Sequence, residues 1–140
     1  MPSAISAVLF DRIKPAFIPP GKPLLQVVVD TEEEFDWAAP FNRASTAVTS
    51  IDAQPLAQAI FAPYGLRPTY VIDYPVATTA ASVAVLKALR DAGQCQIGAH
   101  LHPWVTPPHD EVVNEVNSYA CNLPPALERA KLAALTDCAT

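Results

Sequence analysis

Residues 24–37 read LLQVVVDTEEEFDW, and this stretch decides the fold class. Its three consecutive valines are typical of a buried strand, and α/β proteins gather their functional groups where such strands end. Five of the fourteen acidic residues of the chain lie between Asp30 and Asp36. Like charges crowded at one strand end repel one another unless a cation compensates them. The stretch therefore predicts a buried strand that ends at a site for a metal ion or a basic ligand.

A second motif, IGAHLHPW at residues 97–104, supplies ligands of another kind. In an extended segment the side chains at i and i+2 leave the same face, so His100 and His102 can point together. The same period places Asp30 and Glu32 on one face. Imidazole and carboxylate groups arranged in this way suit one divalent ion, with zinc as the first choice.

These polar residues also have a structural interpretation without a metal. An exposed acidic turn would explain Asp30 and Glu32, although a carboxylate that directly follows a buried strand needs a partner. We expect Glu33 to be such an exposed acid, whereas Glu34 either supports the ligands or faces the solvent. His109 lies in a proline-rich loop and is expected to be exposed.

Three further residues are candidates for lining the site. Trp37 and Trp104 each follow a polar motif directly, so each either packs in the core or forms a platform for a sugar or acyl group. Asp73 ends another apolar run, and either lines the same site or caps the end of a strand.

The pattern predicts two more strands and three helices. Strands are expected at 68–74 and 95–100, and helices at 52–65, 79–92 and 127–135. This βαβαβ order implies right-handed crossovers and a parallel sheet or partial barrel. Three strands are too few to close a barrel, so we expect the architecture to be incomplete.

The helix expected at 52–65 has the clearest boundary signals. Asp52 is the expected N-cap and Pro55 the first-turn proline, and Gly65 ends the unit. Leu56 and Ile60, with the alanine between them at 59, would form the apolar stripe that faces the core.

Composition limits the class of protein. The chain has 140 residues, of which 51% are hydrophobic, enough for one globular domain. We assign residues 1–23 to an extended, proline-rich lead-in and residues 24–140 to the domain. The net charge of −5 argues against nucleic acids and anionic membranes as partners.

The cysteine pattern and hydropathy indicate a compartment. The three cysteines show no CxxC spacing, and an odd number makes a poor disulfide framework, which favours a reducing environment. No apolar stretch approaches the roughly 20 residues that span a bilayer. The N-terminal segment lacks the basic start of a secretory signal. The prediction is a cytoplasmic protein that does not enter membranes.

With both motifs quoted, the chain resembles the polysaccharide deacetylase family, or NodB-homology domain, and most closely its WalW-like branch. Residues 29–37, VDTEEEFDW, are similar to the first motif of that family, and residues 98–104, GAHLHPW, to the second. The resemblance spans about residues 24–135. It implies the N-terminal part of a distorted (β/α) barrel.

The resemblance also implies a chemistry, namely metal-dependent hydrolysis of N-acetyl or related C–N bonds, other than peptide bonds, in a small or oligosaccharide substrate. Asp30 would then be the catalytic base, and Glu32, His100 and His102 would bind the metal. The protein would belong to carbohydrate metabolism.

Two departures from the family pattern accompany the resemblance. The family spaces its two histidines four residues apart, whereas here they are two apart. The later motifs, which include a groove arginine and a distal histidine acting as general acid, have no counterpart in the sequence. We therefore expect a portion of a longer protein that is weakly active or inactive alone and can oligomerise through an uncovered sheet edge.

Two other interpretations remain. The chain could be a partial domain that binds carbohydrate without catalysis. It could also be a metal-dependent amidohydrolase of another type, in which an HxH motif binds metal, although those enzymes place HxH after their first strand.

Overall fold

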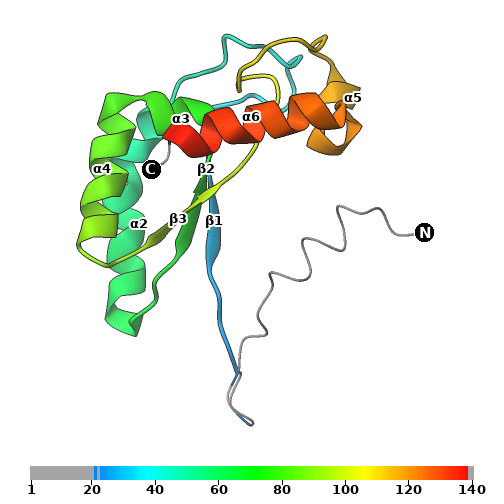
Figure 1. Ribbon diagram of the computed structural model, residues 1–140. Coiled ribbons are helices and arrows are strands. Elements are labelled where there is room, and N and C mark those ends of the chain that lie inside the picture. Colours follow the sequence, from blue (N-terminus) through cyan, green and yellow to red (C-terminus); the bar gives the residue numbers. More distant parts are fainter. Residues whose placement is uncertain (1–20, 22, 139–140) are drawn as a thin grey trace.

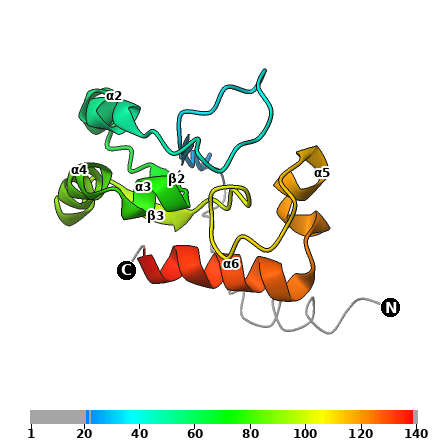
Figure 2. The same cartoon turned by 90° about the horizontal axis from the view of Figure 1, so that it is seen from above.

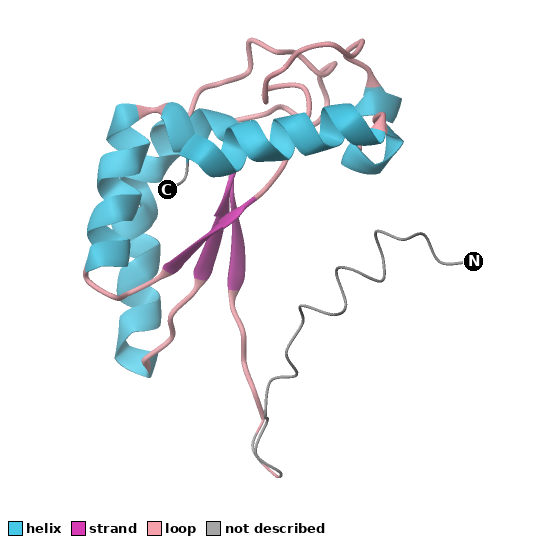
Figure 3. Ribbon diagram, viewed as in Figure 1, coloured by secondary structure: helices cyan, strands magenta, loops and turns pink. Residues whose placement is uncertain are grey.

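The computed structural model describes residues 21 and 23–138, which form a mixed α/β fold around one parallel sheet (Figures 1 and 3). The sheet contains β1 (Val28–Thr31), β2 (Thr69–Ile72) and β3 (Gln96–Ala99), in the order β1-β2-β3. The predicted α/β class and parallel strand order are confirmed. The described strands form an open sheet, and its place in a larger barrel stays a prediction. Most of the expected lead-in at 1–23 lies outside the described residues.

The two faces of the sheet differ in burial. Val29, Tyr70 and Ile97 share one register position and one face, and this face packs against the hydrophobic core. On the opposite face the side chain of Val28 is 54% exposed, and Asp30 is exposed as well. The expectation that β1 is a buried strand is therefore wrong for the face that carries Val28 and Asp30, which is exposed among the described residues.

Helices α2 (Gln54–Phe61) and α4 (Ala80–Asp91) are the crossovers between consecutive strands, and they contact each other (Figure 1). Helix α4 begins after Thr79 and is followed by Ala92 and then by Gly93, whose φ of 70° is left-handed. The helix predicted at 79–92 is confirmed. Of the three residues spaced for one face of this helix, Leu86 and Leu89 are buried in the core, whereas Val83 is 39% exposed.

Helix α2 is rotated relative to the prediction. Leu56 and Ile60 are 74% and 68% exposed, whereas Gln58 is buried at 3%. The Gln58 amide donates to the Gln94 carbonyl and accepts from the Tyr70 hydroxyl, so hydrogen bonds rather than the apolar stripe fix the inward face. The prediction that the stripe of Leu56 and Ile60 faces the core is therefore wrong, because the stripe faces the solvent.

The start of this helical unit also differs from the prediction. A 3-10 helix, η1 (Thr49–Ala53), precedes α2, so Asp52 lies inside a helical turn and Ala53 occupies the N-cap position of α2. The predicted first-turn position of Pro55 is confirmed. A second 3-10 helix, η2 (Ala62–Tyr64), follows, and Gly65 ends it with a φ of 64°.

The remaining elements lie near the carboxyl ends of the strands. The short helix α3 (Tyr74–Thr78) follows β2 directly, and α6 (Pro125–Cys138) crosses above the strand ends, on the side away from α2 (Figures 1 and 2). Between β3 and α6 lie α5 (Glu115–Ser118) and η3 (Ala120–Asn122). Helix α6 confirms the helix predicted at 127–135, whereas α3 and α5 were not predicted.

The core lies between the sheet and the helices. Its buried members come from η1, β2, α3, α4, α6 and the residues directly before η1 and β3: Val48, Ile51, Tyr70, Ile72, Val76, Ala77, Leu86, Leu89, Cys95 and Leu135. Among the described helices, none has the length and apolarity that crossing a bilayer demands.

Candidate metal centre

The candidate site forms where the chain leaves β1 and β3. The His100 N–H donates to the Ile72 carbonyl (2.8 Å). The hydrogen-bonded pairing of β3 with β2 therefore continues one residue beyond Ala99. The Glu33 N–H donates to Asp73 Oδ2 (2.9 Å), which ties the segment after β1 to the end of β2. These bonds bring the acidic motif and the HxH motif to the same edge of the sheet, as the sequence predicts.

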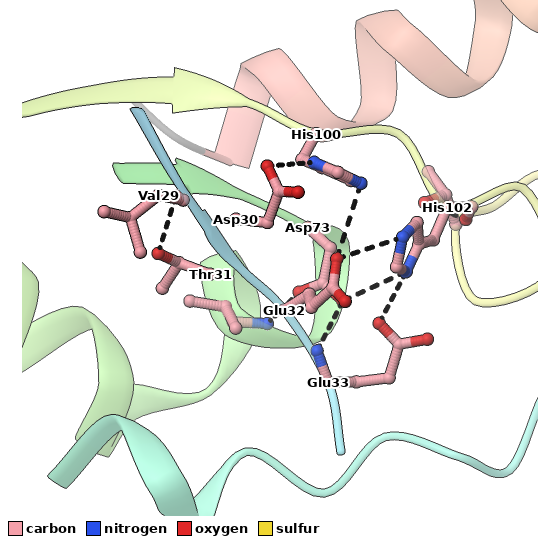
Figure 4. A network of polar contacts seen from close by, with 10 residues as sticks. Val29, Asp30, Thr31, Glu32, Glu33, Asp73, His100 and His102 are labelled. Atoms are coloured by element: carbon pink, nitrogen blue, oxygen red, sulfur yellow. Dashed lines mark hydrogen bonds and ion pairs between the residues drawn. The ribbon is translucent and has the colours of Figure 1, made fainter. Parts of the chain in front are cut away.

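Three of the predicted metal ligands converge. Glu32 Oε2 lies 3.4 Å from His100 Nε2 and 3.2 Å from His102 Nε2, and one ligand atom from each residue lies within 4.8 Å of the others (Figure 4). Ligands bound tetrahedrally to zinc at about 2.0–2.1 Å stand about 3.3–3.4 Å from one another. The two carboxylate–imidazole separations therefore fit a single zinc-sized ion, and these donors are the oxygen and nitrogen ligands that such an ion accepts.

The second ring nitrogen of His102 supports this geometry. His102 Nδ1 lies 2.8 Å from Glu33 Oε2, and we assign the proton of that bond to Nδ1. In the neutral ring the Nε2 lone pair then faces the Glu32 carboxylate at 3.2 Å, which is repulsive without a cation between them. A second proton would also relieve the repulsion, but burial lowers the pKa of His102, against the opposing effect of the Glu32 charge. A metal ion between Nε2 and the Glu32 carboxylate would satisfy both groups.

Glu33 contradicts the expectation of an exposed acid, because its side chain is completely buried beside Asp73 and His102. Burial raises its pKa, and the charge of Glu32 adds to this effect. The alternation of side chains between the two faces of an extended segment indicates this burial, because Glu33 lies on the same inward face as Val29 and Thr31. A carboxylate hydrogen-bonded to a metal-binding histidine is a common arrangement that orients the ring.

Asp73 is both a helix cap and a member of the cluster. Its Oδ1 accepts from the Val76 N–H (3.0 Å) at the N-terminus of α3, while Oδ2 accepts from the Glu33 N–H. Oδ2 also lies 4.0 Å from His102 Nδ1. Burial raises the pKa of Asp73 to about 7, and its contact with Glu33 contributes to the rise. Both predicted roles, a cap and a neighbour of the site, are thus compatible with its position.

Asp30 lies on the open side of the cluster. Its side chain is 66% exposed, and Oδ1 lies 3.4 Å from His100 Nδ1. The acid therefore faces the ring nitrogen of His100 opposite to the one that faces Glu32 (Figure 4). It is accessible to a water molecule or substrate that approaches from the uncovered face of the sheet.

The two tryptophans have different environments. Trp104 is buried and its ring stacks on His102 with centroids 4.3 Å apart, so it packs against a candidate ligand. Trp37 is 67% exposed, and its ring centroid lies 6.4 Å from that of His102. Together with Phe41 and Tyr119, Trp37 lines a cleft of about 660 Å³, and Trp37 is the residue that connects this cleft to the cluster.

Two other acidic or basic candidates lie outside the cluster. Glu34 Oε1 accepts from the Thr49 hydroxyl and the Ser50 N–H, both at 2.7 Å, and so holds the start of η1. His109 is exposed, as predicted.

Comparisons with protein-family models, with curated proteins and with solved structures found no match for this chain. The resemblance to polysaccharide deacetylases therefore rests on the two sequence motifs alone.

Proposed function

We propose that this chain belongs to a metal-dependent hydrolase of N-acetyl or related C–N bonds in a carbohydrate-like substrate. The observation that carries the proposal is the convergence of Glu32 Oε2 on the Nε2 atoms of His100 and His102 at 3.4 and 3.2 Å. Further support comes from the resemblance of both motifs to polysaccharide deacetylases. In this proposal the three-stranded sheet corresponds to the first part of a NodB-type barrel.

The three ligands would hold one divalent ion, with zinc as the first choice. When bound, such an ion lowers the pKa of a water molecule toward about 7 and polarises an acyl carbonyl. Glu33 fixes the tautomer and orientation of His102 through Nδ1. Trp104 stacks on the same ring and keeps bulk water away from it.

Asp30 is the proposed general base. Its exposed carboxylate borders the ligand cluster and can accept a proton from the attacking water, a role that requires access from the solvent. The exposed ring of Trp37 offers an apolar face on which a pyranose ring can stack, with the rest of the substrate in the adjoining cleft.

Metal analysis of the purified protein tests the site. We expect about one zinc ion per chain, and loss of this ion in His100→Ala and His102→Ala. His109→Ala is the matched control, because His109 lies outside the cluster and its replacement should leave the metal content unchanged. Equal metal content in all four proteins would refute the proposed site.

A second comparison separates the proposed roles of the two acids. Asp30→Asn should retain the metal and, in the full-length domain that the proposal implies, lower the release of acetate from an N-acetylated glucosamine oligomer by about 10²–10⁴-fold, since it removes the base. Glu32→Gln should instead weaken metal binding. If both variants lose the metal equally, the division of roles is wrong even though the site stands.

A further inference from the structure

Lys131 of α6 is completely buried, although lysine is among the residues least often found in a protein interior. Its ammonium group donates to the carbonyls of Pro103 (2.9 Å) and Thr106 (2.6 Å). It also lies 3.0 Å from Glu111 Oε2. An ammonium group has three hydrogens, and three acceptors surround this one. A buried charge is tolerated only when it is paired and hydrogen-bonded in this manner.

The two carbonyls belong to the segment that carries His102. Residues 102–106 are all buried, yet they form turns rather than a strand or helix. Inside the segment the Thr106 hydroxyl donates to the His102 carbonyl (2.8 Å), and the Val105 N–H approaches the same oxygen at 3.3 Å. The conformation of His102 therefore depends on a segment in which Lys131 of α6 holds the carbonyls of Pro103 and Thr106.

The same network extends to the cleft. An Arg43 guanidinium nitrogen donates to the carbonyls of His109 and Glu111 and lies 3.6 Å from Glu111 Oε1. Arg43 closely follows Phe41, which lines the cleft beside the cluster. Glu111 thus lies between two cations, Lys131 and Arg43. Through these contacts it connects α6 to the loop that contains Arg43 and to the loop that contains residues 102–111.

We propose that Lys131 is a positioning residue for the metal centre, which holds residues 102–106 in the conformation that directs His102 Nε2 toward Glu32. This inference rests on the proposed function. Lys131 itself contacts neither the candidate ligands nor the cleft; it acts through the Pro103 and Thr106 carbonyls. The sequence offered a signal for its burial, since Lys131 lies four residues from both Leu127 and Leu135 on one helix face.

The test combines zinc affinity with a readout that needs no metal. Lys131→Met removes the charge while keeping the length of the side chain, and Lys131→Met/Glu111→Gln also avoids leaving Glu111 unpaired in the interior. Thr106→Val removes only the hydroxyl that holds the His102 carbonyl. Lys87→Met is the matched control, because Lys87 is an exposed lysine paired with Asp91 on α4.

We expect the folded Lys131 variants to bind zinc about 10–100-fold more weakly, Thr106→Val to show a smaller loss, and Lys87→Met to match the wild type. In the metal-free protein, NMR should show the His102 ring protons shifted upfield by the stacked Trp104 ring, and this shift should decrease in the Lys131 variants. Unchanged zinc affinity and an unchanged His102 shift in folded variants would overturn the inference.

The two readouts separate this inference from the proposed function. A wild-type protein that binds no zinc would refute the proposed function, whereas the His102 shift would still decide whether Lys131 positions the ring. If removal of the Lys131 charge prevents folding, Thr106→Val decides the question: a wild-type His102 shift in that variant counts against the inference.

Discussion

At the scale of single residues, His102 links the open and the buried parts of the site. Its Nε2 faces Glu32, which is partly accessible, and its Nδ1 faces Glu33, whose side chain has no exposed surface. Metal binding requires the neutral ring, and burial lowers the pKa of His102 in favour of that form. The sequence predicts His102 to be a ligand. Its orientation depends on the carboxylate of Glu33, which was expected to be exposed.

Replacing Glu33 should weaken metal binding although Glu33 is not a proposed ligand. Glu33→Gln removes the charged acceptor of the His102 Nδ1 proton, and we expect a loss of zinc affinity on the order of 10-fold or more. Glu34→Gln is the control, since Glu34 binds the start of η1 instead. Competition with a chromophoric chelator measures both. A Glu33→Gln protein with wild-type affinity would show that this hydrogen bond does not support the metal centre.

The raised pKa of Asp73 gives a stability effect with a defined sign. The folded pKa is about 7 and the ordinary value is 3.8, so the folded state binds the proton more tightly and its stabilising contribution is lost as the pH rises through about 7. Between pH 6.5 and 8 the metal-free protein should lose about 1 kcal/mol of unfolding free energy from this group. Below about pH 6.5 the lowered pKa of His102 acts with the opposite sign.

Urea unfolding of the metal-free protein at several pH values checks this dependence, and carboxyl NMR assigns it to Asp73. An Asp73 carboxyl that is fully ionised at pH 6 would contradict the prediction.

At the scale of elements, α2 shows that polar contacts can override an apolar stripe. Leu56 and Ile60 have the spacing of a core-facing stripe, but α2 turns Gln58 inward to meet Tyr70 from β2 and Gln94 from the turn before β3. The buried Tyr70 hydroxyl needs a partner, because leaving it unpaired would cost about 1–3 kcal/mol, which is comparable with the contribution of burying one leucine. Sequence periodicity contains no information about that partner.

Gln58 should therefore matter more for stability than the larger apolar residues beside it. Gln58→Ala removes the hydrogen bonds of Gln58 to the Tyr70 hydroxyl and the Gln94 carbonyl, at a cost of about 1–3 kcal/mol of unfolding free energy. Leu56→Ala, at an exposed position, should change stability by less than about 0.5 kcal/mol. Equilibrium urea unfolding compares them, and a larger loss for Leu56→Ala would show that the stripe faces the core after all.

At the scale of the whole molecule, sequence predicted the order of elements better than their contacts. The ends of the strands, which lie at or within one residue of Asp30, Asp73 and His100, were predictable because local patterns determine where strands end. The local patterns place Glu33 and Lys131 on inward faces, but the partners that make the burial of these charged groups possible are far away in the sequence and could not be predicted: His102 for Glu33, and the segment 103–111 for Lys131. Candidate ligands could be read from motifs, while their supporting residues required the tertiary structure.

The exposed apolar surfaces should make the chain self-associate. Leu56, Ile60 and Tyr64 follow one another at four-residue spacing along α2 and η2, with 74%, 68% and 77% of their surface exposed. Among the described strands, β1 lies at an edge of the sheet, and both features promote association. Sedimentation velocity over a wide concentration range should reveal concentration-dependent oligomers. The double variant Leu56→Lys/Ile60→Lys should reduce them without loss of stability, because both positions are exposed.

The matched control for this prediction is Val112→Lys/Val116→Lys, which places the same charges at two exposed valines in and just before α5. If the α2 face mediates association, the control should still form the oligomers of the wild type. Equal reduction by both double variants would show that added charge alone prevents association, and the α2 face would have no special role. A wild-type protein that stays monomeric at every concentration would show that these apolar residues are tolerated in water as single exposed side chains.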